Sequence, residues 1–220
     1  MSHGSVKMDK YERTSLDELV TRRRSIRKYQ SEMPPEEWIE MMIHCATQAP
    51  SPSNTQPVRF LKISSKKIKE DVHDSMVSGR RHFLKALEKR GGPKRLKNWI
   101  NSYYRFSEFM FKAPLLFAAG TVKSTTGFSR TLFEAGLLDR YDRKDLDITM
   151  GLALKGFVLK GEALGLGSCI LTAPLVFISN VEKILGTGDV DIRCFITVGF
   201  PDEVPGSIER KSVMEVYREV

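Results

Sequence analysis

The sequence contains few cysteines, and they form no pattern. Cys45, Cys169 and Cys194 lie far apart in the chain, without a CxxC pair and without the even number that a disulfide framework needs. This scarcity is typical of proteins that keep their thiols reduced, so we expect a cytoplasmic location. We expect all three cysteines to serve in packing and not as redox partners.

Long apolar runs are also missing. No stretch approaches the roughly 18 consecutive apolar residues of a transmembrane helix, so we expect no membrane span. Of the 220 residues, 41% are hydrophobic and 28% are charged, which is the composition of a folded globular protein and not of a disordered one. No repeat or low-complexity linker divides the chain, and we therefore expect residues 1–220 to form a single domain.

Several active-site signatures are absent. The four histidines do not form HExxH or another metal-binding spacing, so we expect no metal. The chain has neither a GxSxG nucleophile elbow nor a GxxxxGK[ST] phosphate loop. Gly165 and Gly167 form only part of a dinucleotide fingerprint, and they follow a predicted helix where that fingerprint follows a strand. We interpret them as a helix terminator.

Acidic residues are scarce in one segment, which carries the whole excess of positive charge. The chain has a net charge of +8, and residues 66–112 contain 13 Lys or Arg against 5 Asp or Glu, also +8. Such a segment is typical of a solvated helical face, and a pocket rim that attracts anionic cofactors or substrates is an alternative. No basic-aromatic module or zinc-finger spacing accompanies it, so we expect no nucleic-acid partner.

The pattern of apolar residues predicts a helix-rich α+β protein. Ser15 and Glu18 have the spacing of a capping box, with a helix behind them. Further helices are predicted over residues 34–49, 68–79, 147–164 and 178–185, with two more in 80–112 that are separated at 91–93 and a short one within 127–143. Strands are predicted over residues 58–63, 114–121, 168–171 and 194–198.

Two polar segments could bind a ligand. Arg23-Arg24-Ser25-Ile26-Arg27 offers three guanidiniums and a hydroxyl, which suit a phosphate, although a solvated basic turn would have the same composition. Residues 49–57 form a loop with three prolines that keep it rigid. Its serine, asparagine and glutamine side chains can both donate and accept hydrogen bonds, as the edge of a flavin requires, and a capped structural loop is the alternative.

Together these segments resemble the FMN-dependent nitroreductase family. That family has an Arg-Arg-Ser-x-Arg run after its first helix and an Ala-Pro-Ser-x-x-Asn-x-Gln-Pro loop after its second. The resemblance continues from Asp147 into the helix ending at residues 163–168, through residues 194–201 and to Glu209-Arg210. It covers nearly the whole chain apart from residues 80–112 and 127–143. Each motif alone is weak, but four in the correct order are fairly specific.

The resemblance implies a three-layer sandwich, in which helices flank a central and mostly antiparallel sheet of four or five strands. It also implies a homodimer with FMN at the subunit interface. Residues 80–112 would form a variable lid over the substrate side of the flavin. From that lid we select Tyr104 and Phe106 as candidates for stacking on a substrate.

The resemblance also assigns residues to the cofactor. The FMN phosphate and ribityl chain would be held by Arg23, Arg24, Ser25 and Arg27, with Arg210 returning to the phosphate. Asn54 and Gln56 would face the flavin ring and ribityl oxygens. Pro50, Ser51 and Ser53 would approach the same cofactor from the partner subunit. Backbone amides near flavin N5 and O4 would come from Ile170, Leu171, Thr172 and Ala173. One common form of the family has Glu-Gly where this chain has Thr172-Ala173, so we assign only backbone amides at these two positions.

The implied reaction passes hydride from NADH or NADPH through flavin N5 to a nitroaromatic, a quinone or a similar small electrophile. The cofactor carries the electron chemistry, so no side chain is assigned as a general acid or base. Two alternatives remain open. One is a flavoenzyme of the same fold with another reaction, such as a dehalogenase, an enone or azoline oxidoreductase, or a flavin-cleaving enzyme. The other is a flavin-binding redox module without turnover.

Overall fold

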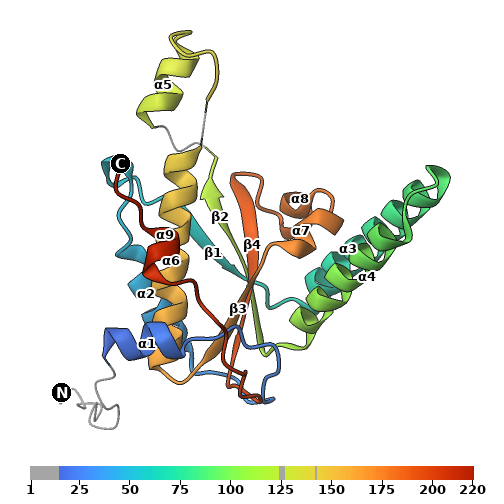
Figure 1. The fold of residues 1–220 in the computed structure, drawn as a ribbon, viewed down its shortest axis with the longest axis horizontal. Coiled ribbons are helices and arrows are strands. Elements are labelled where there is room, and N and C mark those ends of the chain that lie inside the picture. The colour runs from blue at the N-terminus through green and yellow to red at the C-terminus, as the bar shows by residue number, and fades with distance from the viewer. Residues whose placement is uncertain (1–14, 124–126, 142) are drawn as a thin grey trace.

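The computed structural model describes residues 15–123, 127–141 and 143–220. A sheet of four strands lies at its centre, in the order β1-β2-β4-β3, and each neighbouring pair is antiparallel (Figure 1). The strands are β1 (Val58–Lys62), β2 (Leu115–Val122), β3 (Gly167–Leu171) and β4 (Val190–Gly199). All four predicted strands are therefore present.

Helices cover both faces of the sheet. The helices of the described residues are α1 (Leu16–Arg22), α2 (Glu36–Thr47), α3 (Lys66–Lys89), α4 (Lys94–Glu108), α5 (Phe128–Glu134), α6 (Lys144–Ala163), α7 (Ala173–Phe177), α8 (Val181–Leu185) and α9 (Val213–Val216), of which α5 lies away from the sheet (Figure 1). Two 3₁₀ turns join them, η1 (Pro52–Asn54) and η2 (Phe109–Lys112). The capping box predicted for α1 is present, with the Glu18 backbone N–H donating to Ser15 Oγ at 3.2 Å.

Strand β2 divides the interior into two cores, because successive side chains of a strand point to opposite faces. Phe117 and Ala119 pack with α2 and α6, where Phe157 and Met42 are fully buried. Leu116 and Ala118 pack on the other face, with α3, α4, α7 and α8. Two helical layers around one sheet confirm the predicted three-layer architecture.

A β-bulge in this sheet changes the direction of the side chains of β4. Ala119 pairs with Cys194 but Gly120 pairs with Ile192, so Arg193 is the extra residue. A Cβ atom on Gly120 would lie 2.2 Å from the Asp191 carbonyl oxygen, so the close approach requires glycine. Consequently Ile192 and Cys194 lie in opposite cores, although they are two residues apart.

Helix α3 differs from the prediction, which ended this helix at Ser78-Gly79. It continues through Gly79 to Lys89. A Cβ atom at position 79 would lie 1.8 Å from the Phe177 carbonyl oxygen, so this glycine permits α7 to pack closely against α3. The predicted break at residues 91–93 is confirmed, and α3 and α4 form a helical hairpin that projects from the body (Figure 1).

Two shorter segments were also predicted incorrectly. The helix expected over residues 178–185 begins only at Val181, as α8, because Ile178 is extended and Asn180 has a positive φ of 56°. The short helix α7, which ends at Phe177, was not predicted. Helix α9 was not predicted. Among the described residues, no helix has both the length and the hydropathy to cross a bilayer.

The basic segment 23–27 is fixed to the outer edge of β3. The Ile26 backbone N–H donates to the Ser168 carbonyl oxygen at 3.0 Å, and Ser25 forms a parallel bridge with Ser168. The Ile26 side chain is buried against Gly167, where an added Cβ would lie 2.6–2.9 Å from three Ile26 side-chain atoms. The absence of a side chain at Gly167 thus lets the basic segment lie against the sheet.

Replacing Gly167 by alanine should displace Ile26 and the segment that it anchors. Overpacking of this kind costs about 1–3 kcal/mol, and we expect the free energy of unfolding in urea to fall by that amount. Gly188→Ala is the matched control, since nothing lies within 4 Å of an added Cβ there. Equal stability of the two variants would contradict the assigned contact.

Candidate functional site

Two pockets border β3 where the basic segment meets it. The first, the Arg23 pocket, encloses about 340 Å³ between β3 and α6 and is lined by Arg23, Ser25, Gly151, Leu154, Lys155, Val158, Ser168 and Ile170. The second, the Arg27 pocket, encloses about 530 Å³ and is lined by Arg27, Tyr103, Phe106, Ser107, Cys169, Ile170, Leu171, Thr172 and Ala173. Ile170 lines both pockets, so they are neighbours.

The Arg23 pocket has the donors that suit a phosphate and a polyol. Arg23 and Lys155 supply positive charge, while Ser25 and Ser168 supply hydroxyl groups. Within the described part of the chain, Arg23 has no side-chain hydrogen bond. Its five N–H donors are therefore available to a ligand.

The other arginines of this segment are more constrained. Arg24 Nη1 donates to the Thr21 carbonyl oxygen at 2.7 Å and to the Arg23 carbonyl oxygen at 3.1 Å, which caps the end of α1. Arg27 Nη1 donates to the Ser25 carbonyl oxygen at 3.3 Å, and its side chain still lines the second pocket. The structure thus brings Arg23, Ser25 and Arg27 to pockets, whereas Arg24 stabilises the backbone.

Tyr29 holds the basic segment in place. Its hydroxyl donates to the Ile26 carbonyl oxygen at 2.5 Å and lies 2.7 Å from Oγ1 of Thr197, which is fully buried in β4. Burial raises the pKa of Tyr29 well above its usual value, although the hydrogen bond from Thr197 acts in the opposite direction. The hydroxyl therefore stays protonated and keeps both contacts at neutral pH.

The Arg27 pocket is lined by residues 170–173 and by mostly apolar side chains. Cys169 lies in its wall, and burial raises the pKa of that thiol, an effect that Arg27 and Ser25 reduce. Burial also raises the pKa of Cys194 to about 12. Neither cysteine is a thiolate at neutral pH, which agrees with the expectation that they serve in packing.

The polar loop 49–57 has an unusual backbone. Ser53, Asn54 and Gln56 have positive φ values of 51°, 54° and 44°, a conformation that side chains other than glycine rarely adopt. The Gln56 backbone N–H donates to Ser51 Oγ at 2.9 Å, and Gln56 Nε2 donates to Asn54 Oδ1 at 3.0 Å. Strain of this kind clusters at ligand sites and persists only where other interactions fix it.

The structure does not bring this loop to the basic segment. Gln56 lines a third pocket of about 260 Å³ between α2, β1 and α6, and no residue of the loop lines the Arg23 or Arg27 pocket. The resemblance assigned Asn54 and Gln56 to one subunit's flavin and Pro50, Ser51 and Ser53 to the partner's. In the structure the hydrogen bonds of Gln56 hold this loop as one unit.

Of the remaining candidates, only Phe106 lies in a pocket. Arg210 is exposed in the segment before α9 and lines none of the three pockets above. Tyr104 was the wrong choice for substrate stacking, because it is only 4% exposed and packs in the core against Phe177. The neighbouring Tyr103, which is 57% exposed, lines the Arg27 pocket.

The sequence patterns missed Lys155, Ser107 and Tyr103. Helical spacing puts Tyr103 on the same face of α4 as Trp99, four residues earlier, but it does not show which face of the helix lines a pocket. Lys155 is one of three lysines on α6, and only the packing of this helix beside β3 brings it to the pocket.

Comparisons with known proteins identify a family for this chain. The family model described as the nitroreductase family matches residues 20–200. An iodotyrosine deiodinase from Thermotoga neapolitana is 28% identical over 206 residues, which cover 92% of this chain and 97% of that protein.

Solved structures share the fold. A BluB-like flavoprotein from Clostridium difficile has a TM-score of 0.79 at 23% identity, covering 94% of this chain and 99% of that one. The FMN-dependent nitroreductase NfnB from Mycobacterium smegmatis, solved with NADPH, has a TM-score of 0.64 at 18% identity, covering 93% of this chain and 97% of that one. At these identities the likeness concerns the fold alone.

We predict that Tyr29→Phe destabilises the protein by about 1–3 kcal/mol, because it leaves two polar partners unsatisfied, one of them fully buried. The unfolded chain ionises this tyrosine near pH 10 and the folded chain only at higher pH, so the free energy of unfolding of the parent should fall as pH rises above about 10. Denaturant titrations at several pH values should show a smaller decline for the variant. Tyr217→Phe, at an exposed tyrosine, is the control; an unchanged pH dependence in Tyr29→Phe would contradict this role.

Proposed function

The chain belongs to the nitroreductase family, an oxidoreductase family, and we propose that it binds FMN and uses NADH or NADPH to reduce a quinone, a nitroaromatic compound or a similar small electrophile. One observation carries the proposal. The outer edge of β3 brings Arg23, Ser25 and Arg27 together with the backbone of residues 170–173 in two adjoining pockets.

The residues present fit FMN. The Arg23 pocket offers cations and hydroxyls for a phosphate and a ribityl chain, and the Arg27 pocket offers backbone amides and apolar side chains for a planar ring. When bound, FMN supplies the two-electron redox chemistry. The protein then supplies binding, position and electrostatics.

Each group of side chains has a defined role in this proposal. Arg23 and Lys155 neutralise the phosphate, and Ser25 orients the polyol. Arg27 would help to hold the flavin in the Arg27 pocket and would supply positive charge there. Tyr103 and Phe106 form the apolar wall on the substrate side, and no side chain is required as a general acid or base.

We infer that the active form is a homodimer, with one site completed by two subunits. The strained loop 49–57 is polar and is held by its own hydrogen bonds, yet none of its residues lines either of the two pockets within one chain. Large apolar side chains are exposed on α6 and on the C-terminal segment: Ile148, Leu152, Val213, Met214, Val216 and Tyr217. Exposed apolar surface of this kind is typical of an interface, and a second copy would bring the loop to the flavin site.

The test of the function is a purified preparation assayed for flavin and turnover. We expect flavin absorption bands and the reaction of NAD(P)H, a proton and a quinone to give NAD(P)⁺ and the hydroquinone. The reaction is followed by the loss of NAD(P)H absorbance. A preparation that binds FMN but turns over no quinone or nitroaromatic would leave the redox-module alternative.

Reductive dehalogenation is a second candidate, favoured by the 28% identity to an iodotyrosine deiodinase over 92% of the chain. In that reaction an aryl iodide, two electrons and a proton give the arene and iodide. The test that distinguishes the two candidate reactions is the release of iodide from 3-iodotyrosine in the presence of a reductant. If iodide release depends on the bound flavin and is faster than quinone reduction, dehalogenation becomes the favoured function.

The proposed phosphate site yields a prediction for Arg23, which lines the Arg23 pocket, and for Arg210, which only the family resemblance assigns to the phosphate. A charge-assisted hydrogen bond contributes about 1.5–3 kcal/mol, so Arg23→Ala and Arg210→Ala should each weaken FMN binding about 10- to 150-fold. Both variants should lose FMN in gel filtration and recover activity in excess FMN. Arg81→Ala, at an exposed arginine on α3, should keep its cofactor.

Mixing two defective variants tests the shared site. A Ser51→Ala loop variant, at a position that the resemblance assigns to the partner subunit's flavin, and Arg23→Ala should each retain little flavin alone. After reversible dissociation and mixing, heterodimers carry one intact site, and flavin binding should return. No recovery on mixing, with dimers formed, would show that Arg23 and the loop do not serve the same flavin.

A further inference from the structure

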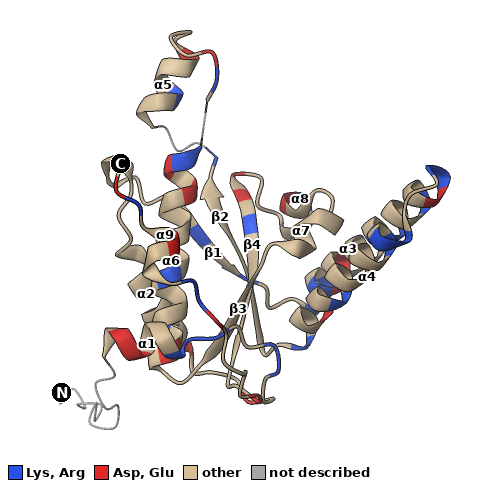
Figure 2. Cartoon of the chain, in the orientation of Figure 1, with Lys and Arg blue, Asp and Glu red and all other residues tan. Residues whose placement is uncertain are grey.

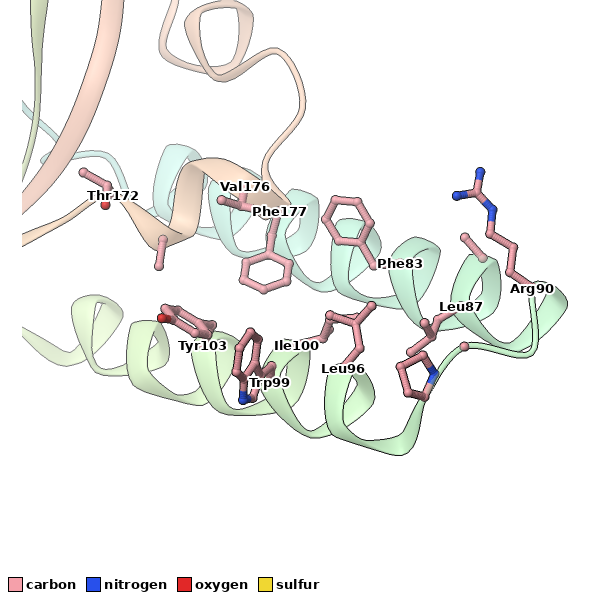
Figure 3. Close-up of a pocket in the computed structure, with 14 residues that line it drawn as sticks. Phe83, Leu87, Arg90, Leu96, Trp99, Ile100, Tyr103, Thr172, Val176 and Phe177 are labelled. Carbon is pink, nitrogen blue, oxygen red and sulfur yellow. The ribbon is translucent and has the colours of Figure 1, made fainter.

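A groove larger than either of the pockets assigned to FMN lies outside them. It encloses about 800 Å³ between the α3–α4 hairpin and α7 (Figure 3). Its walls are almost wholly apolar. The apolar residues that line it include Phe83, Leu87, Leu96, Trp99, Val176 and Phe177. A volume of this size is typical of a site for a small organic ligand.

The groove follows from helical periodicity. On α4, Leu96 and Trp99 are three residues apart and Tyr103 follows four residues later, so all three point to one face. Figure 3 shows these side chains opposite Phe83 of α3 and Phe177 of α7. The rings of Phe83 and Phe177 meet edge to face, with centroids 5.9 Å apart. Trp99 remains 52% exposed, so this apolar face is not filled by the chain itself.

At its inner end the groove is continuous with the candidate flavin site. Tyr103, Thr172 and Ala173 line both the groove and the Arg27 pocket. A molecule whose reactive end lies in the Arg27 pocket can therefore extend along α4. From Tyr103 to Leu96 the helix rises by about 10 Å.

At its outer end the groove is surrounded by positive charge. Residues 80–112 contain ten Lys or Arg and two Glu, a net charge of +8. Figure 2 shows these cations along the hairpin and at its tip, where Arg90 lines the groove. Among the described residues, none of the ten pairs with a carboxylate. Arg95 lies over the Trp99 ring, 4.8 Å from its centroid.

We propose that this groove selects the acceptor of the reaction, and that the acceptor is an elongated amphiphile with an anionic group. The reducible head lies at Thr172 and Ala173, the apolar body lies along Leu96 and Trp99, and the anionic end meets the cations at the hairpin tip. This assignment rests on the proposed function, and it narrows the acceptor from any small electrophile to one with an extended apolar body and a negative charge.

Binding can be measured without turnover, because the chain has only two tryptophans. In a Trp38→Phe background, Trp99 is the sole tryptophan and reports on the groove. The probes are one benzoquinone in three forms: without a chain, with a ten-carbon chain, and with a ten-carbon chain ending in a carboxylate. Quenching of Trp99 in the FMN-loaded protein, without NAD(P)H, gives the Kd of each.

We expect the carboxylate-bearing probe to bind most tightly and the chain-free quinone least tightly, with a difference of about ten-fold or more between these two. Leu96→Glu should abolish the difference while FMN content and the Kd of the chain-free quinone stay unchanged. Leu137→Glu is the matched control, an exposed leucine of the α5 region outside the groove.

Two outcomes would overturn the proposal. The first is equal affinity for all three probes, or a chain effect that Leu96→Glu does not change. The second is Trp99 emission that responds to dilution of the dimer but to no probe, which would mean that a second copy covers the groove. If the binding series holds but no acceptor is turned over with NAD(P)H, the proposed function fails and the groove assignment stands.

Discussion

The candidate site depends on the contact of Ile26 with Gly167. A buried isoleucine in the middle of the basic run fixes the register of its neighbours, because residues 25 and 27 lie on either side of it. Two hydrogen bonds, from the Ile26 backbone N–H to Ser168 and from the Tyr29 hydroxyl to the Ile26 carbonyl oxygen, fix the orientation of the backbone at this buried side chain. Three cationic side chains are thereby held close together on a sheet edge, where mutual repulsion would otherwise separate them.

The two cores serve different parts of the molecule. The core between the sheet and α2 and α6 supports the Arg23 pocket, while the opposite core supports the helical hairpin and α7. Both pockets meet at β3, whose Leu171 belongs to the second core and whose Ser168 faces the first pocket. A change in one core therefore affects one side of the candidate site more directly than the other.

Much of the fold could be predicted from local patterns, since capping residues, prolines and apolar periodicity mark most elements. The predictions were wrong where tertiary contacts, and not local patterns, determine where a helix ends or which residues are buried. Gly79 looked like a helix end, but it accommodates Phe177 in the middle of α3. For the site, the sequence supplied the basic run and the polar loop through motifs. It could not show that Tyr104 points inward and Tyr103 outward, because adjacent helical residues differ in direction by 100° and only the packing partner decides which is buried.

The glycine at position 79 has a mechanical consequence for the hairpin. Because α3 is not interrupted there, it forms a rod of about 36 Å, of which Val72 and Met76 lie in the core near the sheet. Toward its tip the hairpin projects from the rest of the described chain, and its two helices pack on each other (Figure 1). A rod held at one end is displaced most at its free end, so thermal motion changes the groove more at the tip than beside β3. The inner end thus determines where a bound molecule sits, and the outer end adapts to its length.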